Sequence, residues 1–276
     1  MTIQSCAKVA GTVVTFVAIV LAAMSIKAPR AHADDDDRES RIKIGFEIAP
    51  VPLNLAGKDR AMVGLGSYLV NAVGDCNGCH TAGGPPNFNY AQGGNPYFNQ
   101  PQVTDPTVYL SGGQNFGPVG TPTGPNGYSG PNMISRNLTP DKNGLPEGGH
   151  TLSEFKRILR HGKDFDHIHP TCTAAQLAEI EAGATPVCIP TSPGNTVDGD
   201  LLQVMPWPTF SHMSDGDIEA IYEYLSAIPC IDNTTSPPPD GAPNELRNDC
   251  GNGGAAANDA VKDSRTQQAP RARQVR

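Results

Sequence analysis

The chain has 276 residues, of which 38% are hydrophobic and 17% charged, with a formal net charge of -8. This length allows one sizeable domain with a buried core. The acidic balance argues against a nucleic-acid-binding role and leaves an electropositive partner protein possible. The 30 glycines and 26 prolines indicate long irregular loops between the regular elements.

The first residues have the pattern of an export signal. An uncharged stretch runs from Val9 to Ile26, and Ala31-His32-Ala33 then fits the small-x-small rule for signal peptidase. We expect residues 1–33 to be a signal peptide that is removed on export to the periplasm, and residues 34–55 to be an extended leader. The alternative is an uncleaved membrane anchor, because the stretch is long enough to span a bilayer, although at the short end of the range.

The first helix after the leader is predicted at about residues 58–73. Gly64 and Gly66 lower the helix propensity there, which indicates either the close approach of another helix or a merely weak helix. The apolar positions recur at helical spacing: they are Met62, Leu65, Leu69 and Val73.

Further helices are predicted in the second half of the chain. A short one is expected at 174–182, between two longer ones at 151–160 and from residue 214 to about 225. Each longer helix begins with a capping box: the pairs are Thr151 with Glu154 and Ser214 with Asp217.

Six cysteines remain once the signal peptide is removed, and they form three close pairs. An even number in an exported chain indicates bonded cysteines. Near-neighbour disulfides, Cys172 with Cys188 and Cys230 with Cys250, are the simplest expectation for the last four.

The remaining pair belongs to the motif Cys76-Asn77-Gly78-Cys79-His80. Two thiols at this spacing can add across the two vinyl groups of one haem, and the histidine that follows can bind the iron. A redox dithiol and half of a zinc site are the alternatives. A redox dithiol does not require the histidine, and a zinc site needs a second ligand pair. The motif therefore predicts one covalently attached haem c, held by Cys76, Cys79 and His80.

The sixth iron ligand is predicted to be Met205. It is followed by Pro206-Trp207-Pro208, and rigid prolines can hold an extended segment against the haem. The other three methionines that follow the signal peptide are expected to pack in the core: Met62, Met133 and Met213. Four histidines are rival ligands, although solvated loop positions are favoured for them: His161, His167, His169 and His212.

Five further segments carry a family resemblance: Gly66-Ser67-Tyr68-Leu69-Val70, Asn137-Leu138-Thr139-Pro140-Asp141, Phe155 to Gly162, Met205-Pro206-Trp207 and Ser214 to Leu225. Together with the haem motif they resemble class I c-type cytochromes, in particular the haem domains in cytochrome subunits of periplasmic dehydrogenases. The resemblance implies that the first and last helices cross, that His80 is the proximal iron ligand and that Met205 is the distal one.

The resemblance also implies an all-α fold, with class I cytochrome c-like helices wrapped on one covalent haem and long Gly/Pro-rich loops. The expected domain covers residues 56–235, with loop insertions at 84–131 and 164–203, and a mostly disordered tail follows at 236–276. Related subunits often carry several haems, whereas this chain has one CxxCH motif.

The function expected from these features is single-electron transfer in the periplasm, between a dehydrogenase-type donor and a respiratory acceptor. The chain is then an electron carrier and not itself an enzyme, either alone or as the cytochrome subunit of a dehydrogenase complex. The alternative is a haem enzyme or ligand sensor with an open or labile sixth coordination site. A subunit whose haem only completes the core is a third reading.

Overall fold

The computed structural model describes residues 31–81, 98–100, 104–118, 124–166, 168–184, 186–191, 197–232 and 248–251. The predicted signal peptide lies outside these ranges as far as residue 30, and so does the predicted tail except for residues 248–251. Contacts divide the chain into two units, residues 1–40 and 41–276. Every helix after α2 belongs to the second unit.

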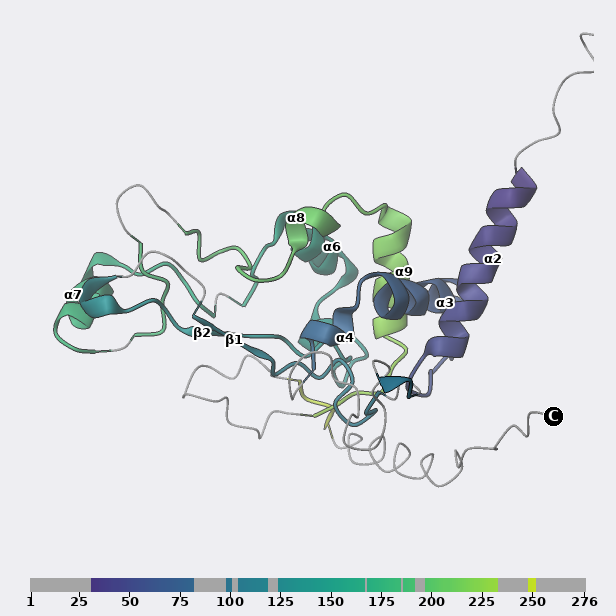
Figure 1. Cartoon of the computed structure of the whole chain (residues 1–276), viewed down its shortest axis with the longest axis horizontal. Helices are drawn as coiled ribbons and strands as arrows, with labels where there is room; N and C mark the ends of the chain where they lie inside the picture. The colour runs from purple at the N-terminus through teal and green to yellow at the C-terminus, as the bar shows by residue number, and fades with distance from the viewer. Residues whose placement is uncertain are drawn as a thin grey trace, which may run out of the picture. The chain divides into compact units, whose positions relative to one another are not determined.

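The helix predicted at 58–73 is confirmed from residue 60 onward. It consists of α3, Arg60–Tyr68, and one π-helical turn, η1, Leu69–Val73. The side chain of Asp59 caps α3 by accepting hydrogen bonds from backbone N–H groups of its first turn. α3 packs against α9, Asp215–Leu225, within the second unit (Figure 1).

Gly66 lies where α3 meets α9. A Cβ atom on this residue would be 1.9 Å from the carbonyl oxygen of Ala220, so only glycine lets the two backbones come this close. The prediction that another helix approaches the first one closely is confirmed.

The variant Gly66→Ala is expected to lose about 1–3 kcal/mol of unfolding free energy, because α3 and α9 must move apart to accommodate the methyl group. Gly216→Ala in α9 is the matched control. A Cβ atom there would have open space, 3.9 Å from Ser214 Oγ, and should stabilise the helix by up to about 1 kcal/mol. Chemical denaturation of both variants measures the difference, and equal stabilities would contradict the packing argument.

α2, Ala31–Ile48, is helical where an extended leader is predicted, so that prediction is wrong as far as residue 48. In the second unit, Ile42 and Phe46 lie four residues apart and pack with the residues of α3. A Cβ atom on Gly45 would lie 1.9 Å from the carbonyl oxygen of Gly64. This tertiary contact stabilises a helix whose own apolar pattern is short.

The other predicted helices are present. α6, Leu152–His161, begins with the reciprocal capping bonds of Thr151 and Glu154 and ends at Gly162, whose φ is 63°. α7 covers Ala174–Glu181. Shorter elements among the described residues are α4 (Cys76–Cys79), α5 (Pro146–Gly149), α8 (Trp207–Phe210), the 3-10 turn η4 (Pro125–Gly127), and the antiparallel strands β1 (Asn115–Pro118) and β2 (Asn132–Ile134).

Two disulfides have the predicted near-neighbour pairing, Cys172 with Cys188 and Cys230 with Cys250. The first closes the loop that contains α7, and both its sulfurs belong to a small core with Ile180, separate from the main core around α3, α6 and α9. None of the described helices is long and apolar enough to cross a membrane.

Candidate functional site

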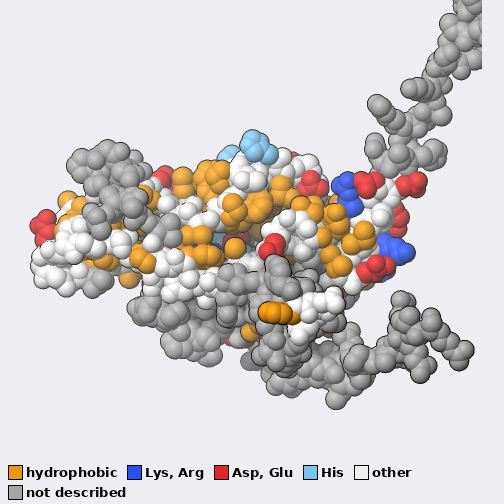
Figure 2. Space-filling view, viewed as in Figure 1, with side chains coloured by type: hydrophobic (Ala, Val, Ile, Leu, Met, Phe, Trp, Pro, Cys, Tyr) orange, Lys and Arg blue, Asp and Glu red, His pale blue; other side chains and the backbone are white. Residues whose placement is uncertain are grey.

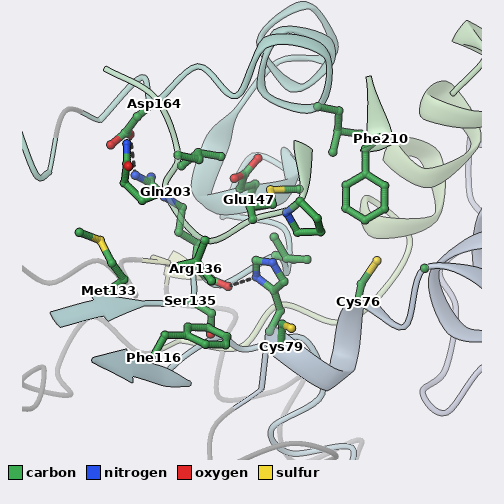
Figure 3. A pocket seen from close by; sticks show the side chains of 18 of the residues that line it. Cys76, Cys79, Phe116, Met133, Ser135, Arg136, Glu147, Asp164, Gln203 and Phe210 are labelled. Carbon is green, nitrogen blue, oxygen red and sulfur yellow. Dashed lines mark hydrogen bonds and ion pairs between the residues drawn. The ribbon is translucent and has the colours of Figure 1, made fainter. Parts of the chain in front are cut away.

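A cavity of about 440 Å³ lies beside α4, within the size range of small-molecule and cofactor sites. Its walls come from η1, β2, α6, α8, α9 and described residues between 164 and 203 (Figure 3). Apolar side chains form most of the wall, among them Leu69, Leu138, Phe155, Leu159, Ile221 and Leu225. Hydrophobic side chains also dominate the middle of the molecular face between α7 and α9 (Figure 2).

The CxxCH motif lies at the edge of this cavity, and Cys76, Cys79 and His80 all line it. Asn77, between the two cysteines, is buried and accepts a hydrogen bond from the backbone N–H of Leu110 at 3.1 Å. Gly112 N–H donates to the carbonyl oxygen of His80 at 3.0 Å. These bonds fasten the motif to the segment around residue 110.

The imidazole of His80 is held in one orientation. Its Nδ1 lies 2.8 Å from the carbonyl oxygen of Arg136, and because a carbonyl oxygen can only accept, Nδ1 carries the proton. Burial lowers the pKa of His80, which keeps the ring neutral. Nε2 therefore keeps its lone pair for a metal ion, in the way that ligating histidines are commonly oriented.

The two thiols have raised pKa values. Burial raises the pKa of Cys76 to about 12, with added effects from Asp75 and Cys79, and the partial burial of Cys79 raises the pKa of that thiol. Redox dithiols depend on a lowered pKa, so these thiols do not match the redox-dithiol alternative. Among the described residues, no cluster of three or more His, Cys, Asp or Glu side chains is placed to hold a metal ion, as a zinc site would need.

Met205 lines the same cavity as His80. Its segment is tied to the end of α6, because Leu202 N–H donates to Gly162 O at 2.7 Å and Trp207 Nε1 donates to Leu202 O at 3.1 Å. The ring of Trp207 lies directly over Gly162, where a Cβ atom would be 2.3 Å from it. The Pro-Trp-Pro segment thus holds Met205 at the cavity wall.

Met133 is buried and Met213 packs against the main core, as expected, and both residues also line the cavity. Met62 packs instead with Leu65 and its neighbours, as expected. Of the rival histidines, His169 lines the cavity whereas His161 and His212 do not, and His167 lies outside the described residues.

A cluster of charged residues in and beside the cavity wall could not be predicted from the sequence. The guanidinium of Arg136 pairs with Asp164, at 2.7 Å, and with Asp166. Burial opposes the charge, but these carboxylates raise the pKa of Arg136. Glu147 is buried in the same wall (Figure 3). Arg136, Glu147 and the two aspartates lie on three separate segments of the chain and form no motif, so no local signal marks them.

The residues present fit a haem. Two thiols, an imidazole with an available Nε2 and a thioether from Met205 line a single apolar cavity. Cysteine thiols attach c-type haems as thioethers, and a histidine imidazole and a methionine thioether can ligate the iron.

Comparison with known proteins finds distant relatives of the chain. No family model matches the chain, and no solved structure matches it. Two relatives, from Gluconacetobacter polyoxogenes and Komagataeibacter europaeus, are each described as "Alcohol dehydrogenase (quinone), cytochrome c subunit". Each is 26% identical over 197 residues, which is 67% of this chain and 27% of the relative, so the match spans about a quarter of their length. The chain therefore has a distant similarity to cytochrome c subunits, consistent with a role in electron transfer.

Proposed function

We propose that this protein is a monohaem class I c-type cytochrome that transfers single electrons. The observation that carries the proposal is the His80 geometry: the CxxCH histidine lines an apolar cavity with its Nδ1 hydrogen-bonded to the Arg136 carbonyl and its Nε2 available. The packing of α3 against α9 supports the all-α, class I fold of the family, with the small β1–β2 sheet as an addition.

Each residue of the site has a distinct role in this proposal. Cys76 and Cys79 would attach the haem by thioether bonds, and His80, through Nε2, and Met205 would hold the iron. The bound haem supplies a one-electron iron couple. The apolar walls exclude water, which favours a high potential. Val73, 61% exposed, and the exposed Cys79 mark the edge of the cavity nearest solvent, where electrons enter and leave.

The partners proposed are a dehydrogenase-type donor and a respiratory acceptor in the periplasm. The two relatives are named as cytochrome subunits of a dehydrogenase, which supports a donor of that class. The acidic chain suits an electropositive partner. The export pattern at residues 1–33 supports the location.

A haem enzyme or ligand sensor is the second candidate, because His169 also lines the cavity and is 6% exposed. A histidine inside the cavity is a possible acid or base for chemistry at an open coordination site.

Absorption spectra of the chain produced in a host that matures c-type cytochromes test the proposal. We expect a pyridine haemochrome spectrum of haem c at one haem per chain, a low-spin spectrum in both oxidation states, and a weak far-red band in the oxidised protein from methionine ligation. A high-spin spectrum that shifts with added cyanide or peroxide would instead support the enzyme or sensor.

A further inference from the structure

Glu147 is a buried carboxylate in the wall of the proposed haem cavity. The residue is 7% exposed, and its Oε2 has no hydrogen-bond partner among the described residues. Figure 3 shows its carboxylate among the side chains that surround the cavity. A buried polar atom without a hydrogen-bond partner lowers the stability of the fold, so its presence needs an explanation in the chemistry of the site.

The backbone holds Glu147 in this place at some cost. Its φ is 55°, in the left-handed region that a residue with a side chain seldom adopts. The turn is held by hydrogen bonds from Glu147 N–H to Leu138 O at 3.3 Å and from His150 N–H to Pro146 O at 3.0 Å. Backbone strain of this kind is concentrated at functional sites.

Burial disfavours an ionised Glu147, and the neighbouring charges act in both directions. Arg136 is the nearby cation, and Asp164 and Asp166 already pair with it. The two negative charges of these carboxylates exceed its single positive charge. Burial raises the pKa of Glu147; Asp166 and Asp164 act in the same direction, whereas His150 and Arg136 oppose them. A small change of charge in the cavity can therefore move the carboxyl between its two states.

We propose that Glu147 binds a proton when the haem iron in this cavity is reduced, so that the protein couples electron transfer to proton uptake. The inference rests on the proposed haem. One electron from a one-electron reductant converts ferric to ferrous iron, and one proton from solvent forms the O–H bond of the Glu147 carboxyl. The added negative charge lies in a low-dielectric cavity, where it strongly favours a neutral neighbouring carboxyl.

Protons can reach Glu147 through ionisable groups that extend to the surface. His150, which interacts with Glu147, has a side chain that is 13% exposed, and its Nε2 lies 3.9 Å from Asp166 Oδ2. The side chain of Asp166 is 39% exposed. These two residues form the proposed route to solvent.

The test is the midpoint potential of the haem-loaded protein as a function of pH. The wild-type potential is expected to fall as pH rises, because reduction is then accompanied by proton uptake. Glu147→Gln keeps the shape of the side chain and removes the titrating group, so its potential should be nearly independent of pH. Glu181→Gln, at an exposed position in α7 outside the cavity, is the matched control and should behave as wild type.

A second measurement on the wild type does not depend on any variant folding. Reduction in weakly buffered solution with a pH indicator should show proton uptake of a substantial fraction of one proton per electron. The reduced-minus-oxidised infrared spectrum should contain a protonated carboxyl band that shifts when glutamate is isotopically labelled.

A wild-type potential independent of pH, or a Glu147→Gln variant that keeps the wild-type slope, would overturn the inference. So would reduction without proton uptake. Failure of the proposed function is a separate result, because the pyridine haemochrome assay would then find no covalent haem in the wild type.

Discussion

Replacing Cys76 and Cys79 together by serine is expected to abolish covalent haem attachment. Both thiols line the cavity and neither is in a disulfide, so both are available to form thioether bonds. Serine cannot form these bonds. Haem staining after denaturing electrophoresis and the mass of the intact chain measure the loss, which should be complete. Either single variant should keep one thioether and show an altered haemochrome spectrum.

The matched control for this variant is Cys230→Ser with Cys250→Ser. This disulfide lies away from the cavity lining, so its removal should lower stability by about 3 kcal/mol and leave haem attached. Covalent haem in the double variant of Cys76 and Cys79 would show that the attachment site lies elsewhere. Loss of haem in the control alone would show that stability, and not the CxxCH motif, governs attachment.

Helices that carry their own boundary signals could be predicted from the sequence. α6 begins at the capping pair Thr151 and Glu154 and ends at Gly162, and the structure contains each of these features. The two disulfides could be predicted because their cysteines are close in sequence. These features depend on local contacts, which a sequence pattern records directly.

α2 could not be predicted because its stability depends on a contact between distant residues. A run of acidic residues precedes this segment, and its apolar residues alternate with other residues, which is the period of a strand and not of a helix: they are Ile42, Ile44, Phe46 and Ile48. The close approach of Gly45 to Gly64 becomes visible only when both helices are present. The helix is therefore a tertiary effect that overrides a weak local preference.

The candidate site also has a part that the sequence predicts and a part that it does not. The motif identifies Cys76, Cys79 and His80, but the group that orients His80 is the backbone carbonyl of Arg136, which any residue type could supply. Glu147 enters the cavity wall through a backbone turn with positive φ that its residue type does not favour. Sequence patterns identify side chains that do chemistry more readily than the backbone that positions them.

Replacing Met205 by leucine is expected to remove the sixth iron ligand and cause the largest change in potential of any methionine substitution. Methionine ligation raises the potential of histidine-ligated haems, so its loss should lower the potential by a sizeable part of the roughly 0.8 V range that axial ligands span. The weak far-red band of the oxidised protein should disappear. Leucine keeps nearly the same volume, which limits the packing cost to less than about 1.5 kcal/mol.

Met133 and Met213 provide the decisive comparison because they line the same cavity. Met133→Leu and Met213→Leu should keep the far-red band and shift the potential only slightly, since each changes the apolar wall without removing a ligand. If one of these variants loses the band and Met205→Leu keeps it, the sixth ligand is that methionine and the Pro-Trp-Pro segment has only a packing role. If the wild type and all three variants have a low-spin spectrum without the band, a nitrogen ligand such as His169 binds the iron. The coordination is then neither the histidine–methionine pair of the proposed carrier nor the open sixth site of an enzyme.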